Sequence, residues 1–260
     1  MGGILFNEII FGPIKSRRLG VSLGINLLPT HSKHCSFNCI YCECGWNPKE
    51  KTNLQLPTRE EVREAMEYSF KKIVAKDSQE LVPDAITFAG NGEPTIHPEF
   101  CGIIDDTIAL RDKYLPNAKV AVLSNATMIH KEEIFEALNK VDDNILKIDG
   151  GTSETIKKIN LPKSSFDLKQ LVGSLKKFNG DLIIQTLFLR GMYNGIEVDN
   201  TTSEEVDAWL NIIRELQPKS VMIYPIDRAT PAKDLIKVPK EELEKIAFKV
   251  KGLNIPVQVY

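Results

Sequence analysis

Apolar residues recur along the chain in short runs separated by longer stretches with helical spacing. Runs rich in Val, Ile, Leu and Phe are typical of strands. They fall at residues 21–28, 84–89, 118–123, 144–149, 181–189, 219–225 and 255–259. Between most of these runs, apolar residues return every three or four positions, which indicates amphipathic helices. The pattern therefore predicts a repeated strand and helix order.

Two of the predicted helices are sharply marked, and each begins with capping-box spacing. The segment 58–76 begins with Thr58 and Glu61 in this spacing. Its apolar face is formed by Val62, Met66, Phe70, Ile73 and Val74. The segment 203–216 follows Thr202 and Glu205, and its apolar stripe contains Val206, Trp209, Leu210, Ile213 and Leu216. Further helices are expected near residues 98–115, 130–140, 166–178 and 239–250.

This element order predicts parallel strands with helices packed outside them, in either a partial barrel or an open doubly wound sheet. No linker or change of composition divides the chain, so we expect one domain over residues 1–260. The segment 29–57 joins the first strand to the first helix without clear periodicity. Loops of this length in compact domains are usually functional.

Composition and charge favour an ordinary folded protein. The hydrophobic fraction is 42%, the charged fraction 26% and the formal net charge −2, with a pI near 6.2. Such a balance gives no overall electrostatic reason to expect a nucleic-acid or membrane partner. The apolar runs are shorter than the roughly 20 residues of a membrane helix, and the N-terminus lacks a signal-peptide pattern. We therefore expect a cytoplasmic location and no membrane association.

Four of the five cysteines lie between Cys35 and Cys44. In a reducing compartment, such crowding indicates metal or redox chemistry rather than disulfides. Cys35, Cys39 and Cys42 form a C-x3-C-x2-C spacing, which leaves one position of a four-ligand site open. Two alternatives to a three-cysteine site with an open position are a zinc site with Cys44 as the fourth ligand and an electron-transfer cluster. Cys101 stands alone and is expected to be a buried structural thiol.

The C-x3-C-x2-C spacing with Tyr41 before the last cysteine resembles the signature of the radical S-adenosylmethionine (radical SAM) superfamily. The resemblance implies an α/β fold, a partial (βα)6 TIM-type barrel with parallel strands and the cluster loop after strand 1. It also implies that Cys35, Cys39 and Cys42 bind a [4Fe–4S] cluster whose open iron is chelated by S-adenosylmethionine. The expected reaction is reductive cleavage to a 5′-deoxyadenosyl radical that abstracts hydrogen from a substrate. Reduced flavodoxin or ferredoxin is the expected electron donor, and the cluster is expected to be oxygen-sensitive.

Two polar strand ends extend the resemblance to the cofactor. The turn Asn91-Gly92-Glu93-Pro94 is similar to the G-G-E-P motif, whose backbone and carboxylate hold the methionine amino group, although Asn91 replaces the first glycine. Ser124 and Asn125 follow the next strand and are similar to the residues that contact the ribose. The resemblance therefore implies that Tyr41 and these six residues bind the cofactor, and the carboxyl ends of parallel strands are where ligands usually bind.

Later strands supply polar residues that are expected to face the barrel interior. Lys147 and Asp149 share one face of their strand, and we predict that they are catalytic residues on the substrate side, unless they only pair with each other. Gln185 and Tyr224 are assigned to the cofactor site, and Arg190 is expected to close its strand. The basic stretch 16–20 is either a solvated charge run or a contact for a carboxylate or phosphate.

Several segments resemble the wyosine-synthase-like branch of the superfamily: residues 11–13, 16–20, 22–26, 91–95, 147–150, 161–162 and 185–188. Better-known members modify tRNA with a second cluster held by upstream cysteines. This chain has no cysteine before Cys35, so a tRNA substrate is not favoured, though it stays open. A small molecule or nucleoside is the first hypothesis, and a peptide or protein substrate, including glycyl-radical activation, is the second. An Fe–S electron-transfer or zinc-binding module without catalysis is the third.

Overall fold

The structure is a computed structural model that describes residues 3–49, 55–75 and 81–260. Two predicted segments extend beyond these residues. Residues 50–54 of the long loop and residue 76 of the first predicted helix lie outside the described residues. The described strands form a single sheet with the order β1-β2-β3-β4-β5-β6-β8-β10, and β7 and β9 both pair with β6. Every neighbouring pair from β2 to β10 along this order is parallel. The predicted parallel α/β architecture is therefore confirmed.

The seven strands expected from the apolar runs are all present. They are β2 (Gly20–Ile25), β3 (Ala85–Phe88), β4 (Lys119–Ser124), β5 (Asp143–Lys147), β6 (Ile183–Tyr193), β8 (Ser220–Pro225) and β10 (Val257–Val259). Three strands were not predicted, namely β1 (Ile10–Ser16), β7 (Ile196–Asp199) and β9 (Leu235–Lys237). All three pair antiparallel, β1 with β2 and the others with β6. The antiparallel pairing extends β6 beyond Arg190, which therefore does not end its strand.

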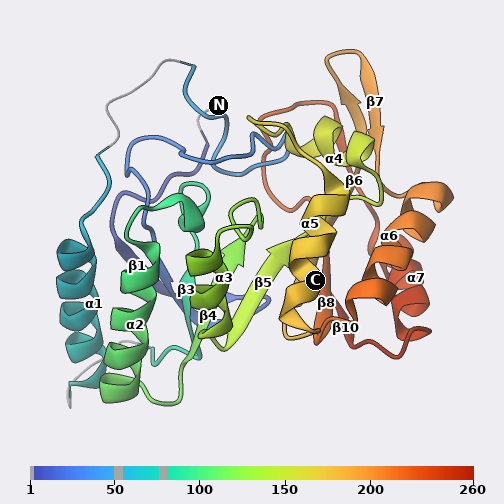
Figure 1. The fold of residues 1–260 in the computed structure, drawn as a ribbon. Helices are drawn as coiled ribbons and strands as arrows, with labels where there is room; N and C mark the ends of the chain where they lie inside the picture. Colours follow the sequence, from blue (N-terminus) through green and yellow to red (C-terminus); the bar gives the residue numbers. More distant parts are fainter. Residues whose placement is uncertain (1–2, 50–54, 76–80) are drawn as a thin grey trace.

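The helices cover the outer face of the curved sheet (Figure 1). They are α1 (Arg59–Val74), α2 (Phe100–Tyr114), α3 (Glu132–Asn139), α4 (Ser153–Asn160), α5 (Leu168–Leu175), α6 (Ser203–Leu216) and α7 (Lys240–Lys251), with 3-10 turns at Pro94–Ile96 and Lys176–Phe178. The described part of the long loop after β2 crosses the end of the sheet where the parallel strands finish. This arrangement is the partial barrel expected from the resemblance. No helix among the described residues is both long and apolar enough to span a bilayer.

Helix packing follows the predicted apolar faces with two differences. On α1, four of the five predicted residues are buried, but Val74 at the last position is 47% exposed. The capping box of α1 forms, since the Thr58 amide donates to Glu61 at 2.7 Å. At the start of α6 the carboxylate of Glu205 instead accepts from the Gly151 amide at 2.8 Å. That helix keeps its Thr202 cap but not the second half of the box.

Buried His97 makes stability depend on pH. Its Nδ1 accepts from the Glu99 amide at 3.1 Å, so the neutral ring donates from Nε2 to the Pro57 carbonyl at 2.8 Å. Burial lowers the pKa of His97. The unfolded chain therefore binds a proton at His97 more readily than the folded chain does. The contribution of neutral His97 to the free energy of unfolding is fully present above roughly pH 6.5 and is lost as the pH falls below that value. We expect His97→Gln to flatten this decline between pH 7.5 and 5.5 in urea unfolding, and equal slopes would refute the assignment.

The inside of the barrel has an apolar floor beneath a polar layer. One buried cluster is formed by inward side chains from four adjacent strands: Ala121, Ile145, Ile183 and Met222. Two residues further along these strands, the side chains reach the cavity above this floor: Leu123, Lys147, Gln185 and Tyr224. The two-residue period of a strand accounts for this layering, since every second side chain points inward. Polar groups are thus placed at the carboxyl ends of the strands.

Candidate active site

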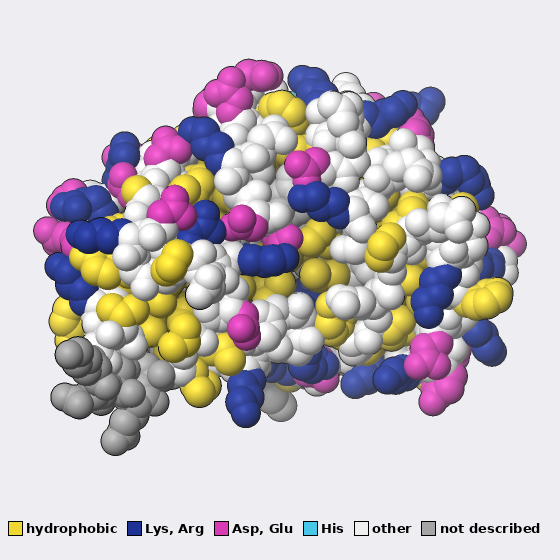
Figure 2. All heavy atoms as spheres, turned by 90° about the horizontal axis from the view of Figure 1, so that it is seen from below, with side chains coloured by type: hydrophobic (Ala, Val, Ile, Leu, Met, Phe, Trp, Pro, Cys, Tyr) yellow, Lys and Arg dark blue, Asp and Glu magenta, His cyan; other side chains and the backbone are white. Residues whose placement is uncertain are grey.

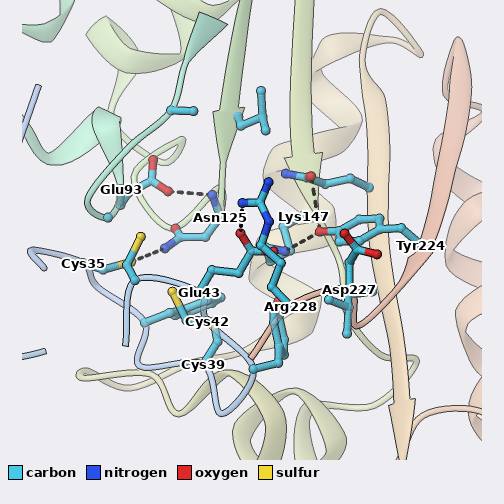
Figure 3. A pocket seen from close by; sticks show the side chains of 18 of the residues that line it. Cys35, Cys39, Cys42, Glu43, Glu93, Asn125, Lys147, Tyr224, Asp227 and Arg228 are labelled. Carbon is cyan, nitrogen blue, oxygen red and sulfur yellow. Dashed lines mark hydrogen bonds and ion pairs between the residues drawn. The ribbon is translucent and has the colours of Figure 1, made fainter. Parts of the chain in front are cut away.

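A cavity of about 290 Å³ lies at the carboxyl ends of the parallel strands. It is closed on one side by the long loop after β2 and lies within the barrel (Figure 3). The predicted site residues that line it are Cys35, Cys39, Tyr41, Cys42, Gly92, Glu93, Ser124, Asn125, Lys147, Gln185 and Tyr224. Cys44 also lines it. The fold therefore brings together most of the residues that the sequence assigned to the cofactor and substrate.

A backbone bridge holds the start of the cysteine loop against the turn after β3. His34 and Gly92 form a parallel bridge, in which the His34 amide donates to the Asn91 carbonyl at 2.8 Å and the Glu93 amide to the His34 carbonyl at 3.2 Å. Gly92 has φ +146°, and a Cβ there would lie 1.9 Å from the His34 carbonyl oxygen. Glycine is required at this position because no side chain fits the close approach.

Side-chain amides fix the rest of the loop. Asn47 accepts from the Cys35 amide at 3.0 Å and donates to the Phe37 carbonyl at 2.8 Å. The Ile40 amide donates to the Ile159 carbonyl at 3.0 Å, which ties the loop to the end of α4. A segment without periodicity is therefore held in one conformation around the cysteines. Sequence reasoning missed Asn47, since nothing in its local spacing indicates its partners.

The thiols of the loop lie in contrasting electrostatic surroundings. Burial raises the pKa of Cys35 to about 12 and that of Cys39 to about 11. A hydrogen bond from Cys44 and the charge of Lys33 lower the pKa of Cys42. Lys33 is 2% exposed and donates to the Gly45 carbonyl at 3.0 Å. A buried ammonium beside three thiols favours their thiolate forms, which are the forms that bind iron.

Two side-chain amides donate to sulfurs of the predicted cluster ligands. Asn125 Nδ2 lies 3.5 Å from Cys35 Sγ and also donates to Ser36 at 2.9 Å. Asn160 Nδ2 lies 3.3 Å from Cys39 Sγ, and its Oδ1 is buried and has no hydrogen-bond partner in the described part of the chain. Hydrogen bonds to the sulfurs tune the reduction potential of a cluster. Asn160 was not predicted, whereas Asn125 was predicted as a ribose contact.

The donor set fits a cubane cluster. Three cysteines line one cavity together with the backbone of Gly90 and Gly92. Among residues 3–49, 55–75 and 81–260, no three His, Cys, Asp or Glu side chains converge as they would around a single metal ion. A cubane cluster does not need that convergence, because its three thiolates bind three different irons.

Cys44 lies beside the three cysteines and is turned toward the backbone. Its Sγ donates to the Gly90 carbonyl at 3.3 Å, and the hydrogen bond with Cys42 raises its pKa. The other remaining thiol, Cys101, lies on α2, where its Sγ donates to the Glu133 carbonyl at 3.3 Å. It is half-buried rather than buried as expected, because α2 packs on the outside of the sheet.

The Glu93 carboxylate collects donors from two strand ends. It accepts from Thr95 and Ser124 on one oxygen, the latter at 2.7 Å, and from the Asn125 amide at 2.6 Å on the other. Burial raises the pKa of Glu93, and these hydrogen bonds oppose the rise. The carboxylate is thus fixed at the edge of the cavity, where it is available to a cationic group.

The other two residues of the turn have a different role from the predicted one. Asn91 does not line the cavity: its side chain is fully buried, and it donates to the Phe6 and Pro29 carbonyls at 2.8 Å. Its side chain therefore anchors the N-terminal segment and does not reach the cavity. Pro94 is buried at the start of a 3-10 turn and also lies outside the cavity lining. The prediction for both residues is corrected on this ground.

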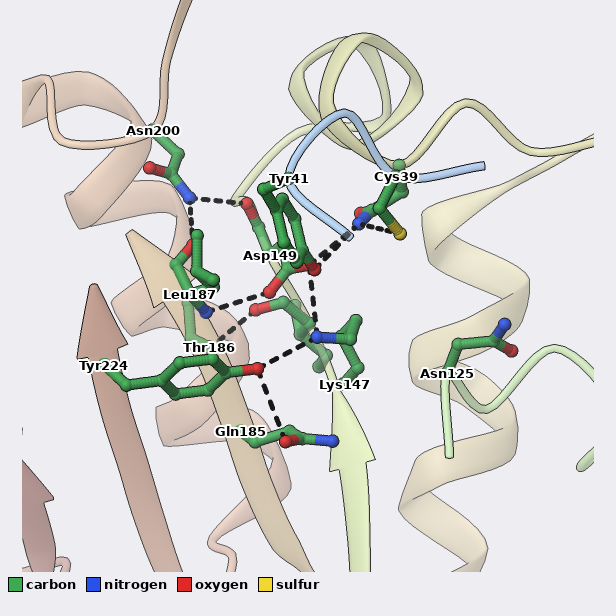
Figure 4. A network of polar contacts seen from close by, with 12 residues as sticks. Cys39, Tyr41, Asn125, Lys147, Asp149, Gln185, Thr186, Leu187, Asn200 and Tyr224 are labelled. Atoms are coloured by element: carbon green, nitrogen blue, oxygen red, sulfur yellow. Dashed lines mark hydrogen bonds and ion pairs between the residues drawn. The ribbon is translucent and has the colours of Figure 1, made fainter. Parts of the chain in front are cut away.

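Asp149 is the centre of a buried network behind the cavity (Figure 4). One oxygen accepts from Tyr41 and from Asn160 at 2.8 Å, and the other from the Leu187 amide at 2.9 Å. Lys147 Nζ lies 3.5 Å from the first oxygen. Asp149 does not line the cavity, since β5 ends at Lys147 and the alternation of faces stops there. It is therefore a positioning residue rather than a catalytic one.

Lys147 itself lines the cavity and contacts two tyrosines, Tyr224 of β8 and Tyr41 of the cysteine loop. Its Nζ donates to the Tyr224 hydroxyl at 3.0 Å and lies 5.3 Å from the Tyr41 ring centroid. Burial opposes its charged form, but Asp149 and Tyr224 prevail and raise the pKa of Lys147. The amine is therefore a cation at neutral pH. It is suited to hold an anion or donate a hydrogen bond, not to attack a carbonyl.

Comparison with known proteins identifies relatives of this chain. The family model of the Radical SAM superfamily matches residues 30–226. The UPF0026 protein of Methanocaldococcus jannaschii is 30% identical over 241 residues, which cover 90% of this chain and 68% of that protein. A UPF0026 protein of Helicobacter pylori is 25% identical over 251 residues, or 95% of this chain and 75% of that one.

A third relative shares only part of its length. A Brachyspira hyodysenteriae protein named GTPase Obg is 30% identical over 244 residues, which cover 91% of this chain but 32% of that protein. The chain thus spans about a third of this relative. It contains no G-x-x-x-x-G-K-S/T sequence for binding nucleotide phosphates. The name of that relative is therefore not transferred.

Solved structures share the fold at low sequence identity. A radical SAM methyltransferase from Sphaerobacter thermophilus has a TM-score of 0.65 and 13% identity, covering 92% of this chain and 65% of that one. TYW1 with a lysine-pyruvate adduct bound has a TM-score of 0.61 and 14% identity, covering 90% and 75%. Similarity at this level supports the barrel architecture alone.

Proposed function

We propose, from the premise that the chain belongs to the radical SAM superfamily and to its UPF0026 proteins, that Cys35, Cys39 and Cys42 hold a [4Fe–4S] cluster which binds S-adenosylmethionine. The chain is a radical SAM enzyme. When bound, the cluster and S-adenosylmethionine supply a 5′-deoxyadenosyl radical on reduction, and the radical abstracts hydrogen from a substrate. The proposal is carried by one observation, that the three thiols line a single cavity with the Gly92-Glu93 turn.

The protein's own groups orient the cofactor and exclude water. Glu93 is positioned to accept hydrogen bonds from the methionine amino group, and Ser124 and Asn125 lie beside it as candidates for ribose contacts. Tyr41 contributes a buried ring beside Cys39, and its hydroxyl is held by Asp149. The strand ends therefore provide polar groups, while the floor and Tyr41 keep the site dry.

The substrate is proposed to be a small molecule or nucleoside that enters beside Lys147, Gln185 and Tyr224. These side chains line the cavity on the strands opposite the cysteine loop. On the face shown in Figure 2, Lys and Arg side chains alternate with Asp and Glu, without a broad basic area among the coloured residues. Binding of a tRNA backbone depends on clustered cations, and the formal net charge of −2 gives no overall excess of them.

The proposed function is tested by anaerobic reconstitution of the full chain with iron and sulfide. We expect visible absorbance from the cluster and, after addition of reductant and S-adenosylmethionine, formation of 5′-deoxyadenosine. Reduced flavodoxin or ferredoxin is the proposed donor, and dithionite provides a chemical comparison. Exposure to air is expected to bleach the absorbance. Correctly folded protein that shows neither cluster absorbance nor cleavage would contradict the proposal.

A further inference from the structure

Arg18 is a cationic side chain that lines the cavity and has no role in the proposed function. It lies in the turn between β1 and β2, and its half-buried side chain extends into the barrel. Nη1 donates to Gln185 Oε1 at 2.9 Å, and the guanidinium carbon lies 4.8 Å from the centroid of the Tyr224 ring. The Tyr224 hydroxyl also receives the bond from Lys147. Arg18 and Lys147 therefore contact the same tyrosine.

The other cationic side chains that line the cavity lie beside carboxylates or thiols. Arg17 pairs with Asp227 at 3.0 Å and Arg228 with Glu43 at 2.7 Å, both at the surface. Lys147 has Asp149 at 3.5 Å, and Lys33 lies among the loop thiols.

In contrast, no carboxylate of the described residues lies within ion-pair distance of Arg18. A guanidinium carries five N–H donors, and the contact with Gln185 uses only part of them. A partly buried cation with spare donors is suited to bind an anion.

The position of Arg18 separates it from the methionine end of the cofactor. Arg18 precedes β2, whereas the cysteines follow it, and β2 has 6 residues. At about 3.3 Å per residue, the strand places the two backbone segments at opposite ends of the sheet. Arg18 reaches up from the floor, where Leu19 and Tyr260 pack on the apolar cluster. An anion bound by Arg18 therefore lies on the substrate side of the cavity.

We propose that the substrate carries a carboxylate or phosphate group that binds Arg18, with Lys147 as the second cation and Tyr224 between them. This proposal rests on the proposed function, since it assigns the substrate class of the same cavity. The planar fork of arginine matches two oxygens of either anion. Such an anion would also reduce the repulsion between Arg18 and Lys147. A neutral nucleoside, in contrast, leaves the charge of Arg18 unmatched.

The test measures anion binding by the cluster-loaded protein without reductant. Sodium phosphate and sodium acetate are the probes, added at constant ionic strength, and acetamide is the neutral counterpart of acetate. Binding to the folded protein raises the melting temperature. We expect a rise with an anion but not with acetamide, and binding that is about tenfold or more weaker in Arg18→Gln. Arg63→Gln is the matched control, since Arg63 lies on α1 and pairs with Glu60.

The outcomes separate this proposal from the proposed function. A larger response to phosphate indicates a phosphorylated substrate, and a larger response to acetate indicates a carboxylate. If Arg18→Gln does not fold, Arg18→Lys keeps the charge without the fork, and we expect a weaker response than in the wild type. A full response in these variants, or none in the wild type, overturns the anion site. Cluster absorbance and 5′-deoxyadenosine formation by the wild type test the proposed function independently.

Discussion

Alanine in place of Cys35, Cys39 or Cys42 is expected to remove the cluster and abolish formation of 5′-deoxyadenosine. In the proposed site each thiolate would bind a different iron of the cubane, so the loss of one thiol would leave that iron without its protein ligand. The loop is fixed by the bridge at Gly92 and by the amides of Asn47. Iron and sulfide content, visible absorbance and the yield of 5′-deoxyadenosine under anaerobic conditions measure the effect.

Alanine in place of Cys44 is the matched control, and it is expected to leave the cluster in place. Cys44 is the nearest other cysteine, yet its Sγ donates to the Gly90 carbonyl. Its removal takes away one hydrogen bond to Cys42, not an iron ligand. Cys101→Ala on α2 controls for general effects of losing a thiol. Loss of the cluster in the Cys44 variant would instead indicate a site with four thiolates.

Local patterns were sufficient to predict the parts of the fold that depend on local physics. Periodicity located the seven parallel strands and six of the helices, and the capping spacing at Thr58 located the start of α1. Three of the missed elements are short, since α4 has 8 residues and β7 and β9 have 4 and 3, and the fourth, β1, has 7 residues of which none is buried. Such segments show little periodicity, and the strands form because β6 extends past the barrel to pair with them.

The candidate site also contains features that follow from local sequence and features that depend on long-range contacts. The cysteine spacing and the glycine turn are each contiguous in sequence, so their common position at one cavity could be predicted. Asn47, Asn160 and Lys33 act through partners that only the folded loop brings near, and no local spacing reveals them. The direction of the Asn91 side chain could not be predicted either, because its partners Phe6 and Pro29 lie more than sixty positions away in the sequence. Long-range contacts thus decide which polar residues face the cavity.

Replacing Asp149 by asparagine is expected to lower the free energy of unfolding by about 3–5 kcal/mol, the range for removing one partner of a buried ion pair. Every contact of this carboxylate is a donor: Tyr41, Asn160, Lys147 and the Leu187 amide. The asparagine amide would present its own N–H groups to some of these donors. Urea unfolding of the cluster-free chain at pH 7 measures the loss. Asp227→Asn, at a surface pair, is the control and should cost under about 1 kcal/mol.

A second variant identifies the unpaired charge as the cause. In Asp149→Asn, Lys147 keeps its charge in a cavity where its side chain is only 14% exposed. Adding Lys147→Met removes that charge, so the double variant should be more stable than Asp149→Asn alone. If the two effects simply add, the pair does not act as a unit, and the loss comes from the hydrogen bonds of Tyr41 and Asn160. Because Asn160 also donates to Cys39, the single variant should further reduce the amount of cluster that reconstitution incorporates.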